Sequence, residues 1–185
     1  KKADMPTARA FFAGGIVNGK IYIIGGWRGA GNLLSIVEEY DPVTDKWTKK
    51  ADMPTTRSTF SSGVVNGKIY VIGGNGGARG TVVEEYDPVS DTWTYKTDMP
   101  RARVGPTASL VNDKIYIIGG GDSSYETIVE NDVYDTLTKT WTTIADIPTP
   151  RINPQAIVLN GKIYVIGGVT GYSDGEKSLT TVEEY

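Results

Sequence analysis

The 185-residue sequence contains no cysteine and no histidine. These two absences exclude disulfides, thiolate nucleophiles, imidazole bases, Cys/His zinc sites and Ser-His-Asp triads from this segment. The formal net charge of −3 is too small to indicate nucleic acid as a partner. No apolar run is long enough to span a bilayer and no secretory signal pattern opens the chain, so we expect no membrane contact. The lack of cysteine leaves the compartment open.

One unit is copied four times along the chain. The segment VNGKIYIIGG at residues 17–26 returns with few changes at 65–74, 111–120 and 159–168. Trp47, Trp93 and Trp141 recur in phase with it, at intervals of 46 and 48 residues. A period of this length predicts a propeller or a solenoid. We therefore expect a single domain, 1–185, built from repeats 1–48, 49–94, 95–142 and 143–185.

The first half of each repeat has the pattern of a β-hairpin. In the first copy an apolar stretch at 11–17 leads into Asn18-Gly19, which is followed by Lys-Ile-Tyr-Ile-Ile at 20–24. Asn-Gly between two such stretches is a strong signal for a tight hairpin turn. Both faces of the second arm are apolar, which indicates a strand covered on both sides. The sequence therefore predicts sheets that are sandwiched between neighbouring sheets.

The second half of each repeat adds two more short strands. In the first copy these are 36–40 and 46–48, with Asp41-Pro42 in the turn between them. Four antiparallel strands in about 47 residues, without helical periodicity, are typical of a propeller blade. We expect the aromatic residues Tyr22, Tyr40 and Trp47 to fill the space between blades.

A Gly-Gly doublet after a strand, followed by tyrosine and then tryptophan at fixed spacing, resembles the kelch repeat. The matching residues are Gly25-Gly26, Tyr40 and Trp47; Gly73-Gly74, Tyr86 and Trp93; Gly119-Gly120, Tyr134 and Trp141; and Gly167-Gly168 and Tyr185. The resemblance implies an all-β propeller of the kelch type with four blades of four antiparallel strands. We expect these glycines and aromatics to be structural, since they identify the fold and not the ligand.

The ends of the sequence cut the repeat at two points. Residues 1–7 match 49–55, which follow a Trp-Thr pair, and the chain stops at Tyr185, so the last blade lacks its outer strand. Kelch propellers usually have more than four blades, so the resemblance implies part of a larger ring or array. The alternatives are a closed four-bladed ring, or a homodimer that shares one ring through the unpaired outer edge of the last blade.

Alternating strand direction divides the turns between two faces. The loops after Gly-Gly and the Ala-Asp-Met-Pro connectors form one face, here the loop face; the Asn-Gly hairpins and Asp-Pro turns form the other, here the turn face. One arginine per repeat lies on the loop face, at Arg9, Arg57, Arg103 and Arg151. Such a ring suits recognition of anions, and the resemblance to ubiquitin-ligase adaptors of the kelch type implies acidic peptides.

A structural role for these four arginines is the alternative that we favour. Each would pair with a carboxylate of its own connector, which is Asp4, Asp52, Asp98 or Asp146. An acidic residue also recurs in the third strand of every repeat, at Glu38, Glu84, Asp132 and Glu183. We interpret this acidic residue as a repeated structural partner of a buried hydroxyl group or arginine.

The loops after Gly-Gly differ in length and sequence, which makes them the better ligand candidates. They contain Trp27, Arg28, Arg79, Tyr125 and Tyr172. Exposed aromatic residues beside arginine resemble a contact surface for a peptide or a sugar. The alternative is ordinary packing within the loops.

Enzyme chemistry has few candidates in this sequence. The copper site of galactose oxidase, a kelch enzyme, needs histidine and cysteine, which are absent. An acidic iron site of the kelch specifier type would fall on Asp122, Glu126 and Glu130, whose spacing in a loop does not bring the carboxylates together. A mutarotase-like pair of Arg57 with Glu126 or Asp174 is geometrically conceivable. We therefore expect no catalytic residue, cofactor or metal.

The interpretation that these observations favour is a non-catalytic recognition module. It would bind a protein segment, such as an acidic peptide, or a glycan through the loop face. One alternative is a carbohydrate-active kelch domain whose site lies partly in further blades. The other is a repeat scaffold without a ligand, because copies this similar indicate recent duplication or consensus design.

Overall fold

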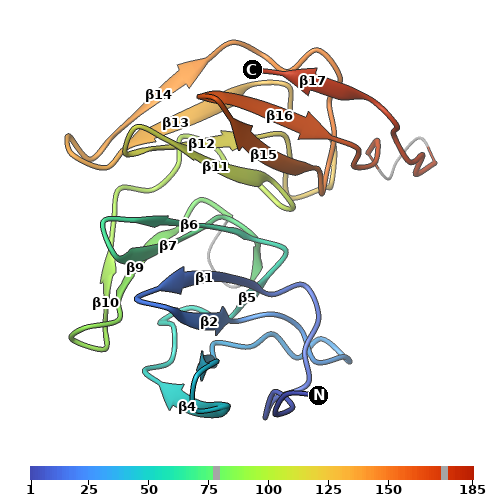
Figure 1. Cartoon of the computed structure of the whole chain (residues 1–185). Helices are drawn as coiled ribbons and strands as arrows, with labels where there is room; N and C mark the ends of the chain where they lie inside the picture. Colours follow the sequence, from blue (N-terminus) through green and yellow to red (C-terminus); the bar gives the residue numbers. More distant parts are fainter. Residues whose placement is uncertain (77–79, 172–174) are drawn as a thin grey trace.

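The computed structural model describes residues 1–76, 80–171 and 175–185, and in these ranges the regular structure is entirely β (Figure 1). The first blade contains β1 (Ala13–Val17), β2 (Lys20–Ile24), β3 (Val37–Asp41) and β4 (Lys46–Lys50). The second contains β6 (Ser61–Val65), β7 (Lys68–Ile72), β9 (Val83–Asp87) and β10 (Thr92–Tyr95). The third contains β11 (Thr107–Val111), β12 (Lys114–Ile118), β13 (Asn131–Asp135) and β14 (Thr140–Ile144).

The fourth blade has three strands, β15 (Gln155–Leu159), β16 (Lys162–Ile166) and β17 (Val182–Glu184). Every blade is antiparallel, with its strands in sequence order from the inside outward. The innermost strands contact one another in the order β1, β6, β11 and β15. This is the β-propeller arrangement that the sequence predicts, and the strand bounds agree with the expected ones to within about two residues.

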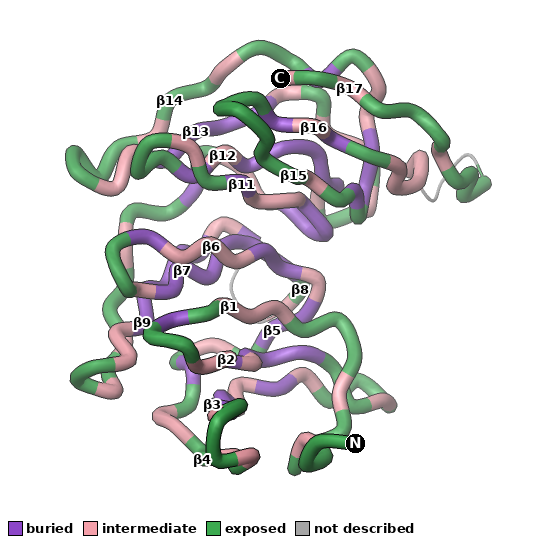
Figure 2. Tube along the Cα trace, in the orientation of Figure 1, coloured by how far each residue is buried: buried purple, intermediate pink, exposed green. Residues whose placement is uncertain are grey.

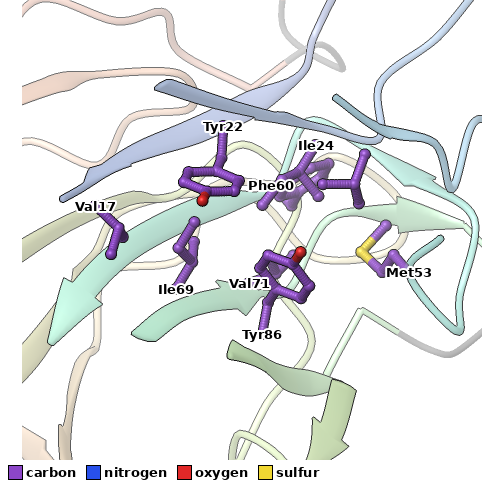
Figure 3. Close-up of a cluster of buried hydrophobic side chains, with 9 residues drawn as sticks. Val17, Tyr22, Ile24, Met53, Phe60, Ile69, Val71 and Tyr86 are labelled. Atoms are coloured by element: carbon purple, nitrogen blue, oxygen red, sulfur yellow. The ribbon is translucent and has the colours of Figure 1, made fainter. Parts of the chain in front are cut away.

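Apolar side chains fill the space between consecutive blades (Figure 3). Between the first and second blades, Val17 and Tyr22 pack against Ile69, Val71 and Tyr86. The Tyr22 and Tyr86 rings lie 5.9 Å apart, which confirms the expectation that aromatic residues join the blades. Each fully buried aliphatic side chain contributes about 1.5–3 kcal/mol. The strands are apolar on both faces because each inner blade is covered on both sides.

The two ends of the blade array leave apolar side chains uncovered, and strands at these ends are drawn largely as exposed or intermediate (Figure 2). Val17, which the second blade covers, is 4% exposed, whereas its counterpart in the fourth blade, Leu159, is 57% exposed. Ile166 and Val182 on the same face are 37% and 60% exposed. At the other end of the array, Ile16 of the first blade is 67% exposed. These faces have the composition of a blade interface.

Main-chain hydrogen bonds connect the four blades near the axis. One equivalent residue in each blade, Phe11, Thr59, Gly105 and Asn153, has a φ between 50° and 61°. The amide of each of the last three donates to the carbonyl of its counterpart in the preceding blade, at 2.7 to 3.0 Å. A cavity of about 520 Å³ lies on the axis, between the starts of the four innermost strands.

Candidate functional site

The repeated arginines lie at the base of the loops that follow each Gly-Gly doublet. Arg57 donates through Nη1 to the carbonyl of Gly73 at 3.0 Å and to that of Val82 at 2.9 Å. These carbonyls stand at the two ends of one loop, so a single guanidinium clamps both ends. The same contact recurs at Arg9, Arg103 and Arg151, which donate to the carbonyls of Gly25, Gly119 and Gly167.

Each of these guanidinium groups also pairs with the acidic residue of the third strand. Arg57 pairs with Glu84, and the other pairs are Arg9 with Glu38, Arg103 with Asp132 and Arg151 with Glu183. In every blade the carboxylate also accepts a threonine hydroxyl, for example that of Thr55 on Glu84 at 2.7 Å. This confirms that the third-strand acid is a structural partner of both an arginine and a hydroxyl group.

The structure corrects two expectations about the four arginines. Their side chains are only 0 to 4% exposed, so they do not present a ring of cations at the mouth of the channel. Their ion-pair partners are not the connector aspartates Asp4, Asp52, Asp98 and Asp146. The reason is the strand pairing, which carries each arginine under its loop and against the third strand.

Burial determines the electrostatics of the Arg57–Glu84 pair. It lowers the pKa of the Arg57 guanidinium and raises the pKa of the Glu84 carboxyl group. Removing two charges from water is costly. The Arg57 nitrogens all find acceptors, which offsets part of this cost, whereas Oε1 of Glu84 has no hydrogen-bond partner in the described residues. The clamp therefore fixes the loops in place, and its buried arginines do not contribute to a ligand contact on this face.

The variable loops meet in a pocket of about 490 Å³, here the loop-face pocket. The described residues that line it are all uncharged: Phe11, Trp27, Gly31, Leu33, Ser58, Thr59, Asn75, Tyr125 and Asn153. The pocket thus brings together Trp27 and Tyr125, two of the residues that the sequence singled out. The side chain of Arg28 is exposed beside Trp27, while Arg79 and Tyr172 lie outside the described residues.

The backbone holds the aromatic residues of this pocket in place. Trp27 and Ala10 exchange two main-chain hydrogen bonds, and Trp27 also bridges to Leu33. The Phe11 and Trp27 rings are 6.1 Å apart and tilted by 51°, with 58% and 37% of each residue exposed. Elsewhere in the lining, Asn75 donates to the Tyr125 hydroxyl at 3.0 Å. The pocket therefore has an aromatic wall and an amide-and-hydroxyl wall.

The sequence analysis did not identify several residues that line the loop-face pocket. Phe11 lies in the predicted first strand, but its left-handed backbone places it before β1 and turns it toward the pocket. Asn75 belongs to a two-stranded sheet of β5 (Arg57–Ser58) and β8 (Asn75–Gly76), which the repeat pattern does not reveal. One signal was available, because Phe11, Thr59, Gly105 and Asn153 occupy one position of an otherwise constant repeat and all differ.

The enzyme candidates do not form a site in the described residues. Arg57 is buried against Glu84, so it does not form the pair with Glu126 considered from the sequence, and Asp174 lies outside the described ranges. Asp122 accepts the amides of Ser124 and Glu126 in a turn. Over the part of the chain that the structure covers, no group of three acidic, His or Cys residues could hold a metal. Likewise, no described helix is long and apolar enough to cross a membrane.

Comparison with known proteins identifies the family. The model of the kelch motif matches residues 8–54, 56–100, 102–148 and 150–185. Beta-scruin of Limulus polyphemus is 42% identical over 48 residues, a segment that covers 26% of this chain and 5% of that protein. The solved structure of YjhT superimposes with a TM-score of 0.87 at 18% identity, covering 100% of this chain and 71% of the other. Together with the blade architecture, these matches show that the chain belongs to the kelch-repeat β-propellers.

Proposed function

We propose that this propeller is a non-catalytic recognition module that binds a protein segment in the loop-face pocket. The observation that supports the proposal most strongly is the uncharged pocket with an exposed aromatic wall of Phe11 and Trp27. Clefts of about 300–1,000 Å³ with apolar walls and a few polar groups are typical binding sites. Aromatic residues of this kind often contribute most of the binding energy at protein interfaces.

The pocket favours a peptide with an apolar or aromatic side chain at its centre. Such a side chain would pack against Trp27 and Leu33, while Asn75 and Tyr125 would bond to its main chain. Arg28 is exposed at the rim and would attract an acidic residue next to that side chain. Acidic character in the ligand would therefore lie at the periphery of the contact.

The experiment is selection of peptides from a displayed random library on the purified chain, followed by titration of the best binder. Trp27→Ala should weaken binding at least tenfold, which corresponds to about 1.4 kcal/mol. Tyr95→Ala is the matched control, because Tyr95 is 60% exposed on the outer strand β10. No enrichment of peptides, or equal affinity of the two variants, would refute the proposal.

A glycan is the second candidate, because an aromatic wall together with amide and hydroxyl groups also suits a sugar ring. Competition by a simple monosaccharide would favour this candidate over a peptide. Turnover of that sugar would favour the carbohydrate-active alternative. Each outcome assigns the loop-face pocket to a different class of ligand.

We also propose that the chain self-associates at the end of the array. The outer edge of β17 has no further strand in the described residues, and Leu159, Ile166 and Val182 beside it are partly or largely exposed. An unpaired edge next to an apolar face favours association. A second copy would cover both, giving a homodimer.

A further inference from the structure

A second pocket, of about 300 Å³, lies between the second and third blades on the turn face, opposite the loop-face pocket. Its walls include three lysines, Lys68, Lys96 and Lys139, together with Tyr134 and Glu85. Glu85 pairs with Lys96 at 3.0 Å and with Lys68 at 3.5 Å. Lys68 also pairs with Asp87 at 3.3 Å. In the described residues Lys139 forms no ion pair, so one positive charge is in excess around this pocket.

The same position in the first two blades holds an aspartate in place of Lys139. Asp91 of the second blade accepts the Tyr86 hydroxyl at 2.6 Å and the Ala51 amide at 2.9 Å, and Lys50 lies 3.9 Å away. In the first blade Asp45 accepts the equivalent tyrosine hydroxyl and connector amide at 2.6 and 2.9 Å. A carboxylate is therefore the regular occupant of this position between a connector and the next blade.

At this position the third blade has the same hydrogen-bond donors but no carboxylate to accept from them. Its donors are the hydroxyl of Tyr134, the amide of Thr97 and the ammonium of Lys96, which are the counterparts of Tyr86, Ala51 and Lys50. Tyr134 is 1% exposed, and its hydroxyl group makes no hydrogen bond within residues 1–76, 80–171 and 175–185. The ammonium group of Lys139 has no lone pair and cannot accept these donors.

Lys139 also occupies a backbone conformation that does not suit it. Its φ is 60°, close to the 56° of Asp91 and the 57° of Asp45. Aspartate tolerates the left-handed region better than lysine does, because its short side chain bonds locally. A lysine at this position therefore replaces an internal carboxylate with a cation while the fold around it stays the same.

We propose that the pocket between the second and third blades binds an oxyanion group, a carboxylate or a phosphate, in the place of the missing aspartate. One oxygen would accept the Tyr134 hydroxyl and the Thr97 amide, as the carboxylate of Asp91 accepts their counterparts. Lys96 and Lys139 would neutralise its charge, and bonds of this charge-assisted kind are about twice as strong as neutral ones. The site is independent of the loop-face pocket.

The test is nuclear magnetic resonance of the labelled chain during titration with sodium acetate or with inorganic phosphate, at constant pH and ionic strength. We expect a saturable shift of the Thr97 amide and of the Tyr134 ring. Saturation by acetate alone identifies a carboxylate site, and saturation by phosphate alone identifies a phosphate site. No saturable shift with either anion would overturn the proposal.

Three variants make the test specific. Lys139→Asp restores the internal carboxylate and should weaken anion binding at least about tenfold, the value of one charge-assisted hydrogen bond. Lys46→Asp makes the same change of charge at an exposed site of the first blade and should leave binding unchanged. Asp91→Lys should create a second site, reported by the Ala51 amide. Equal weakening by Lys139→Asp and Lys46→Asp would show a general charge effect and refute the site.

Discussion

Arg103 and Asp132 form an ion pair at 2.7 Å in which neither side chain is exposed. Removing one partner of such a pair leaves an uncompensated charge in the interior, at a cost of about 3–5 kcal/mol. We expect Asp132→Ala to lower the free energy of unfolding by this amount in urea titrations.

Glu130→Ala is the control for this prediction. The Glu130 carboxylate lies 3.4 Å from Arg101 and is 47% exposed, so its loss should cost less than about 1 kcal/mol. Similar losses in the two variants would contradict a clamping role for the buried pair.

The Gly-Gly doublet should tolerate alanine poorly at its second position. Gly74 has a φ of 97°, and a Cβ atom there would lie 2.6 Å from Cβ of Phe60 and 2.7 Å from the Ser58 carbonyl oxygen. Gly19 also has a positive φ, 74°, but nothing lies within 4 Å of its added Cβ. Gly19→Ala should cost about 1 kcal/mol from the backbone alone, and Gly74→Ala about 1–3 kcal/mol more. Thermal unfolding of the two variants measures the difference, and equal melting temperatures would show that close packing at Gly74 is unimportant.

Repetition within the chain explains how much of the fold could be predicted. Four copies of a hairpin, three with Asn-Gly turns and one with Asn-Asp, define strand order and spacing, because local turn chemistry sets the register. The partner of Arg57 was harder to identify, since the nearest aspartate in sequence is Asp52 whereas Glu84 comes from a strand 27 residues away. The sequence predicted that Glu84 pairs with a buried hydroxyl group or an arginine but did not single out Arg57, since the pattern fixes recurring positions and not the contacts between them.

Acid should weaken the turns at the ends of the third strands. Asp41 accepts the amides of Val43 and Thr44 at 2.8 and 3.2 Å, and these bonds hold its pKa below the ordinary 3.8. The folded form then binds fewer protons than the unfolded form, so this stabilisation is complete above about pH 3.8 and is lost as the pH falls through the lower folded pKa. In urea titrations across this pH range, Asp41→Asn should lose less free energy of unfolding than the wild type.

Asp4→Asn, at a side chain 79% exposed, serves as the control. If Asp41→Asn leaves the pH dependence of the free energy of unfolding unchanged, the turn is not the source of the acid sensitivity.

Self-association at the end of the array can be measured by light scattering coupled to size exclusion. We expect the wild-type chain to elute with twice its mass of 20.0 kDa. Val182→Lys, at a residue 60% exposed on β17, should shift the mass to that of the monomer because it places a charge in the apolar contact. Val43→Lys adds the same charge at a turn residue 92% exposed and should leave the dimer intact. A monomeric wild-type chain would refute the dimer and leave the ligand pockets unaffected.

The two pockets illustrate different limits of sequence reasoning. The loop-face pocket depends on loops from three blades and on the left-handed backbone at Phe11, neither of which a repeat pattern describes. The pocket between the second and third blades on the turn face could have been inferred from the sequence, because Asp45 and Asp91 align with Lys139. What the sequence does not show is that a buried tyrosine hydroxyl and a main-chain amide depend on that carboxylate.

The arginine clamp separates two parts of each repeat, a framework of strands and the loop that follows Gly-Gly. Because Arg57 holds the carbonyls of Gly73 and Val82 together, the strands on either side of the loop keep their spacing whatever chain connects them. Loops of new length and composition can therefore be exchanged between blades, by recombination or by design, without repacking the sheets. This gives the propeller a modular surface, on which loops can change in length and composition while the framework beneath them keeps its geometry.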